Sequence, residues 1–147
     1  MIHASFDNVS SIKAKRLILT ATQFTQIQNQ AKSTVRTKIY RYYEIMRGAK
    51  RVGVAVLISR KVRSKKATIL YAFDNKAQLI FTEIMAFAEP PEFIPSPIWM
   101  SQLQKQKASA RLMVGKDIPT ISGATLSARC VSDAARIARA IYQIAIQ

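Results

Sequence analysis

Between residues 38 and 87 the sequence reads as a succession of strands joined by short turns, and this pattern constrains the fold more than any other feature. In the stretch 51–62, large apolar side chains alternate with Gly53, Ala55 and Leu57. One face of this strand is therefore large and apolar, and the other is small and partly covered. Strands that follow one another with short connections pair as antiparallel neighbours. The sequence predicts an antiparallel meander of about four strands, at 38–47, 51–62, 67–73 and 78–87.

Helical patterns flank these strands on both sides. Thr20 and Gln23 fit a capping box at the start of a first helix. Prolines break the pattern after the last strand, and Pro97 suits the first turn of a short helix over 98–106. From Ser122 onward, apolar residues recur at helical spacing, which predicts a long final helix with Ser122 as its N-cap. The predicted fold class is α+β, an antiparallel sheet packed with helices.

The length of 147 residues and a hydrophobic content of 49% fit a single domain with its own core. A domain of this size buries about 68–70% of the surface of its extended chain. The segment up to about Ile12 has no hydrophobic period and is expected to be a tail. We therefore expect an N-terminal tail and helix over 1–37, followed by the main body of the domain over 38–147.

Cysteine and histidine are almost absent, which excludes several kinds of chemistry. Cys130 is the only cysteine and His3 the only histidine, so internal disulfides, cysteine-based metal sites and histidine-dependent triads cannot form. Cys130 falls on the apolar face of the final helix and is expected to be inert core. No pattern places Glu83 and Glu92 as a pair of catalytic carboxylates. The chain is therefore a poor candidate for a hydrolase.

The formal net charge of +15 is unusually positive for a domain of this size. Such a charge fits nucleic acid, an anionic membrane surface or an acidic redox partner. It also fits an ordinary solvated surface. Neither a recognition helix nor an aromatic-rich ribonucleoprotein strand is evident, so nucleic acid is not favoured.

The start of the final helix, SGATLS at 122–127, is the candidate binding motif. Helix N-termini expose unpaired amides and a partial positive charge, which suits a phosphate. Gly123 and Ala124 would let a phosphate approach the backbone, and Ser122, Thr125 and Ser127 carry hydroxyl donors. A valine at position 123 should then crowd the phosphate more than it disturbs the helix. An ordinary capped helix has the same composition, so the motif alone leaves both interpretations open.

The SGAT helix start resembles the signature of the FMN-binding domain family, which includes subunits C and G of the sodium-pumping and Rnf-type reductases. Further stretches are similar to that family in the same order. They are 42–44 with 52–56, 89–93 followed by Trp99, and 114–118. The similarity extends from about residue 38 to residue 142.

The resemblance implies that FMN is bound at the SGAT turn by Ser122, Gly123, Ala124, Thr125, Leu126 and Ser127. In many members of the family a flavin transferase joins the FMN phosphate to the motif threonine, here Thr125. The family usually has an aspartate three residues before the serine, where this chain has Pro119, and Asp117 is out of register. The resemblance therefore leaves covalent and non-covalent binding both open.

Two more residues are candidates for the flavin site. Trp99 would stack on or border the isoalloxazine, or it is a half-buried core anchor. Glu89 would accept a hydrogen bond from the flavin or from a loop amide.

The implied function is an FMN-carrying electron-transfer protein rather than a stand-alone enzyme, because the cofactor supplies the redox chemistry. Its expected partner is a redox protein such as a cytochrome or a membrane reductase. The expected location is the periplasm or the outer face of the cytoplasmic membrane, with a leader that this chain does not include. The alternatives are a basic nucleic-acid-binding module and a flavin-binding accessory or sensor domain.

Overall fold

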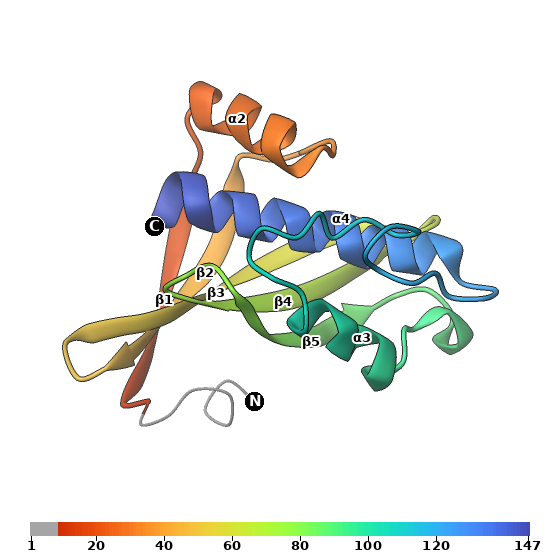
Figure 1. Ribbon diagram of the computed structural model, residues 1–147. Coiled ribbons are helices and arrows are strands. Elements are labelled where there is room, and N and C mark those ends of the chain that lie inside the picture. Colours follow the sequence, from red (N-terminus) through yellow and green to blue (C-terminus); the bar gives the residue numbers. More distant parts are fainter. Residues whose placement is uncertain (1–8) are drawn as a thin grey trace.

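One antiparallel sheet organises the molecule (Figure 1). The structure is a computed structural model that describes residues 9–147, and His3 lies outside this range. The strands pair in sequence order and are β1 (Ser11–Ile18), β2 (Ile39–Arg47), β3 (Lys50–Lys61), β4 (Lys66–Asp74) and β5 (Leu79–Phe87). The predicted α+β meander is confirmed, with five strands rather than about four.

The additional strand is β1, which begins at Ser11. The prediction of a tail that reaches about Ile12 is therefore wrong for its last two residues, which belong to this strand. Every residue of β1 pairs with β2, from Ser11 opposite Met46 to Ile18 opposite Ile39. Because β1 is an edge strand with most of its side chains exposed, it needs no regular apolar alternation to be stable in this position. Residues 11–18 of the segment 1–37 are therefore part of the same sheet as the strands of the main body.

Within residues 9–147 the α-helices are α2 (Ala21–Ala31), α3 (Pro97–Gln104) and α4 (Thr125–Ile141). A 3-10 turn, η1 (Pro91–Phe93), precedes α3, and a π-helical turn, η2 (Tyr142–Ile146), follows α4. The capping box of α2 is confirmed, since Thr20 Oγ1 accepts from the Gln23 amide at 3.1 Å and Gln23 Oε1 accepts from the Thr20 amide at 3.0 Å. None of the helices in residues 9–147 combines the length and the apolar character needed to cross a membrane.

The core lies between α4 and one face of the sheet, and α2 packs against the far side of α4 (Figure 1). Val54 and Val56 of β3 are fully buried in this core, together with Ile137 and Ile141 of α4. On the opposite face, Ala55 belongs to a small second cluster bordered by half-buried side chains. The prediction of a large apolar face and a small, partly covered face is confirmed for residues 54–58, whereas Val52, expected on the large face, packs against the second cluster.

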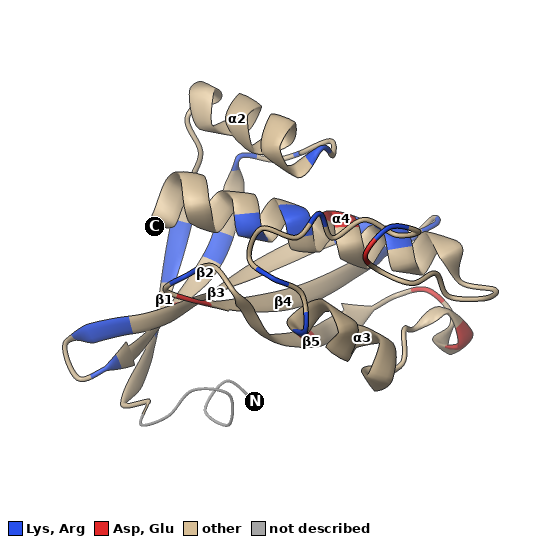
Figure 2. Cartoon of the chain, viewed as in Figure 1, with Lys and Arg blue, Asp and Glu red and all other residues tan. Residues whose placement is uncertain are grey.

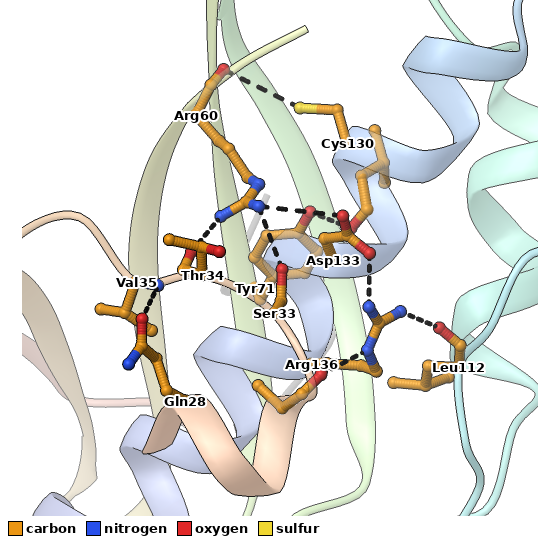
Figure 3. A network of polar contacts seen from close by, with 12 residues as sticks. Gln28, Ser33, Thr34, Val35, Arg60, Tyr71, Leu112, Cys130, Asp133 and Arg136 are labelled. Atoms are coloured by element: carbon orange, nitrogen blue, oxygen red, sulfur yellow. Dashed lines mark hydrogen bonds and ion pairs between the residues drawn. The ribbon is translucent and has the colours of Figure 1, made fainter. Parts of the chain in front are cut away.

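A buried arginine connects three separate segments of the chain (Figure 3). Arg136 of α4 donates hydrogen bonds to the carbonyl oxygens of Ala31 and Leu112, each at 2.7 Å, and forms an ion pair with Asp133. Asp133 also faces Arg60 of β3, with 3.8 Å between the charged atoms. The end of α2, the connector before α4, and β3 are thereby held to the same helix turn.

Cys130 is buried on the sheet-facing side of α4, as predicted. Burial raises the pKa of its thiol to about 11. A thiol with this pKa is protonated at neutral pH and is a poor nucleophile, so Cys130 serves in packing.

Candidate anion-binding site at the start of α4

The start of α4 differs from the prediction in one respect. Ala124, not Ser122, occupies the N-cap position, and no side chain caps the helix. Gly123 has a φ of 77°, and the Ala124 amide donates to the Ile121 carbonyl at 3.0 Å, so this segment forms a turn ahead of the helix. A β-branched residue at a positive φ is strained even where space is free. A valine at 123 would therefore strain the backbone even without a ligand, and the expectation that it crowds the phosphate more than it disturbs the helix stays a prediction.

A cavity of about 280 Å³ opens at this uncapped helix start. It is lined by residues 123–127 together with Arg63, from the turn between β3 and β4, and Phe93, from η1. The Arg63 guanidinium lies over the Phe93 ring at 4.6 Å from its centre, a cation–π contact that favours one orientation of the arginine. A full positive charge thus borders the same cavity as the partial positive charge of a helix N-terminus.

Ser127 is a further unusual residue at this helix start. Its side chain is 1% exposed and lines the cavity, and its hydroxyl has no hydrogen-bond partner within residues 9–147. Leaving a buried polar group unpaired costs about 1–3 kcal/mol, so such groups are rare in proteins. Ser132 has a similarly unpaired hydroxyl further along α4, but it does not line this cavity.

Glu89 supports the turn that carries Arg63. Its carboxylate accepts hydrogen bonds from the Arg63 amide at 3.1 Å, from the Ser64 amide at 3.4 Å and from the Ser64 hydroxyl at 3.3 Å. Glu89 is 6% exposed and does not line the cavity. Of the two predicted roles, the structure gives it the contact with loop amides.

Trp99 likewise makes the contacts of a core residue. Its side chain is 8% exposed, and its indole N–H donates to the Pro119 carbonyl at 2.9 Å. It does not line the cavity at the start of α4. Trp99 instead holds the connector that leads into the SGATLS turn against α3.

Asp117 closes the same connector on itself. Its carboxylate accepts hydrogen bonds from the amides of Leu112 and Met113, each at 2.8 Å. Partial burial alone would raise the pKa of Asp117, but the hydrogen bonds from Met113 and Leu112 outweigh it and lower the pKa. Asp117, which is out of register with the family motif, therefore stabilises the connector before α4 in this chain.

The lowered pKa gives a prediction for Asp117→Asn. A carboxyl whose pKa is lower in the folded state stabilises the fold fully above its unfolded pKa of about 3.9, and this contribution is lost as the pH falls through the folded value. We expect the variant to lose about 1 kcal/mol of unfolding free energy at pH 7, a difference that shrinks as the pH falls from the unfolded pKa through the lower folded pKa. Urea denaturation at pH 7 and at a pH below the unfolded pKa measures it. The exposed Glu92→Gln should show no such difference, and a loss for Asp117→Asn that is the same at both pH values would contradict the explanation.

Of the predicted residues 122–127, the structure places 123–127 at the cavity and leaves Ser122 outside its lining, and sequence reasoning missed Arg63 and Phe93. Arg63 belongs to a basic turn that is visible in the sequence, and Phe93 to the proline-rich stretch after the last strand. No spacing relates either of them to residue 123, because their proximity arises from the packing of distant elements. The only available signal was the position of Arg63 in a tight turn between two predicted strands.

Comparison of the whole chain with protein-family models, with curated proteins and with solved structures finds no match in any of the three. The resemblance to the FMN-binding domain family therefore stays a prediction that rests on the residues quoted for it.

Proposed function

We propose that this chain binds FMN, with the flavin phosphate in the cavity at the start of α4, and that it transfers electrons between protein partners. The observation that carries the proposal is the meeting of three anion-binding features in one cavity. They are an uncapped helix N-terminus, the guanidinium of Arg63 and the unpaired hydroxyl of Ser127.

A phosphate monoester satisfies all three features at once. It carries about −1.5 to −2 charges at pH 7 and offers strong acceptor oxygens. The amides of the first helical turn and the Ser127 hydroxyl are donors to those oxygens, and arginine pairs with phosphate through two parallel hydrogen bonds. The ligand would give Ser127 a hydrogen-bond partner, which it lacks among the described residues.

The size of the cavity limits how much of the flavin it holds. Its volume of about 280 Å³ is slightly below the usual range of ligand pockets, about 300 to 1,000 Å³. We propose that the phosphate occupies the cavity and that the isoalloxazine ring lies outside it. Phe93 and the 46% exposed Leu126 offer apolar surface for the ring at the rim.

Thr125 is the proposed attachment point if the flavin is covalent. It is the first residue of α4, is exposed to solvent and lines the cavity, so a transferase has access to its hydroxyl. Intact mass after denaturation, with and without a co-expressed flavin transferase, distinguishes a phosphoester from reversible binding.

The surface charge fits an acidic redox partner. Figure 2 shows lysine and arginine distributed over β1, the β2–β3 hairpin and α4, whereas acidic residues are few. A positive field attracts a negatively charged partner and raises the rate of encounter. The proposed partners are a cytochrome or a membrane reductase, and the proposed location is the periplasmic side of the membrane.

Titration of the purified protein with FMN and with riboflavin tests the proposal. We expect saturable binding of FMN and much weaker binding of riboflavin, which lacks the phosphate. Arg63→Gln should weaken FMN binding by about 10- to 100-fold, and Ser127→Ala by about 3- to 10-fold. Quenching of flavin fluorescence measures both affinities.

Two matched controls make this test specific. Lys65→Gln removes an equal charge from the same turn, and Ser132→Ala removes the other unpaired hydroxyl of α4. Both should leave FMN affinity within about twofold of wild type, an expectation for surface or non-contacting substitutions. Equal affinity for riboflavin and FMN would show that the phosphate does not bind in this cavity. A colourless protein that binds nucleic acid in a salt-dependent way, and not FMN, would favour the alternative function.

A further inference from the structure

A second cavity, of about 510 Å³, lies between the segment 35–40, the end of β3 and α4. It is larger than the cavity at the start of α4 and shares no residue with it. Four cationic residues line it: Arg36, Arg60, Lys61 and Lys66. They come from the connection between α2 and β2, from the end of β3 and from the start of β4, so the chain fold gathers them from three segments.

Two of these cations face each other directly. Lys61 and Lys66 are cross-strand partners at the end of the β3–β4 pair. Like charges directly opposite each other on neighbouring strands destabilise the sheet. Neither lysine forms an ion pair with a carboxylate in the part of the chain that is described, and the same holds for Arg36.

The remaining cation, Arg60, is fixed in place (Figure 3). Its guanidinium donates to the Thr34 carbonyl at 2.8 Å and to the Ser33 hydroxyl at 3.0 Å, and it lies 3.8 Å from the carboxylate of Asp133. In this region the carboxylate of Asp133 is thus set against the four cationic residues that line the cavity. A guanidinium held by its neighbours loses little conformational freedom when a ligand binds.

Hydroxyl groups and an apolar floor complete the cavity. Thr37, Tyr40 and Ser59 contribute the hydroxyls, and buried aliphatic side chains form the floor. Burial raises the pKa of Tyr40 to about 12, so its hydroxyl carries its proton at physiological pH and is available as a donor. The Tyr40 ring is 8% exposed and offers no platform on which a base could stack.

We propose that this cavity binds a small anion made of two or more linked phosphates. A chain of phosphates is longer than a single phosphate and is therefore better suited to bridge cations that come from three segments. Such an anion would relieve the repulsion between Lys61 and Lys66, which no carboxylate within residues 9–147 neutralises through an ion pair. A concave site without a stacking platform favours the phosphate chain over a nucleic acid strand. The inference is independent of the flavin site.

Calorimetric titration with inorganic tripolyphosphate at low salt tests the proposal. We expect saturable binding by the wild type. Lys61→Gln/Lys66→Gln should weaken it at least tenfold, because two charge-assisted contacts are lost. Lys13→Gln/Lys116→Gln removes the same charge from two exposed positions outside the cavity and should leave the affinity within about threefold. Arg63→Gln should also leave it unchanged, which separates this cavity from the flavin site.

A second readout uses the protein without ligand. Because Lys61→Gln/Lys66→Gln removes a like-charge pair, its melting temperature should rise by about 1–3 °C, and that of the control pair should not. ATP should bind no more tightly than tripolyphosphate, and tighter binding would identify a nucleotide as the source of the phosphates. Absence of binding, equal losses in both double variants, equal affinity for orthophosphate, or tighter binding of single-stranded RNA through the same lysines would each overturn the proposal.

Discussion

Replacement of Arg136 by methionine should lower the free energy of unfolding by about 3 kcal/mol. The guanidinium is 6% exposed and donates to the carbonyl oxygens of Ala31 and Leu112, and methionine leaves both oxygens without this donor. Removing one member of a buried ion pair typically costs about 3–5 kcal/mol. The loss should lie at the lower end because Asp133 is 29% exposed and retains its contact with Arg60.

Urea denaturation followed by circular dichroism measures this effect. Arg129→Met is the matched control on the same helix, since Arg129 is exposed, and it should change stability by no more than about 0.5 kcal/mol. A cost for Arg136→Met no greater than that of the control would show that the arginine network contributes little to the fold.

Trp99→Ala should cost about 3–5 kcal/mol of unfolding free energy, the usual range for deleting a buried large aromatic side chain. Trp99 packs in the main core and anchors the connector through its hydrogen bond to Pro119. Trp99→Phe keeps much of the packing and removes the donor, so its expected cost is about 1–2 kcal/mol. Ile98→Ala, at a neighbouring position that is 77% exposed, should stay within about 0.5 kcal/mol of wild type.

The phenylalanine variant also separates the two roles predicted for Trp99. If the tryptophan is a core anchor, Trp99→Phe should bind FMN with wild-type affinity at a temperature where both proteins are folded. A loss of tenfold or more in FMN affinity, without a matching loss of stability, would instead place Trp99 beside the flavin.

Sequence reasoning predicted the parts of the fold in which local pattern and tertiary environment agree. The apolar alternation of β3 and the helical spacing in α4 are both consequences of facing one core. The strand β1 was not predicted, because an edge strand whose side chains are mostly exposed pairs with its neighbour without any apolar pattern in its sequence. The N-cap moved from Ser122 to Ala124 because the positive φ of Gly123 puts a turn before the helix, and composition alone does not reveal that angle.

The candidate sites show the same limit more strongly. The helix start at 123–127 is contiguous in sequence and was found, whereas Arg63 reaches it only through the packing of the β3–β4 turn. The cavity that contains Lys61 and Lys66 depends on strand register and on the path of the segment 35–40. Patterns in a single sequence carry little information on which distant residues lie together in the fold. The basic residues scattered along the chain were therefore also compatible with an ordinary solvated surface.

A sheet whose strands follow sequence order has two free edges, and this chain protects each of them differently. The β1 edge exposes Lys13, Lys15 and Arg16, while at β5 the Gln104 side chain donates to the Ile80 carbonyl at 2.8 Å. Exposed strand edges are templates for pairing with other chains, and lysine on an edge strand discourages that pairing. Part of the positive charge therefore works against self-association and aggregation, whatever ligand or partner the remainder serves.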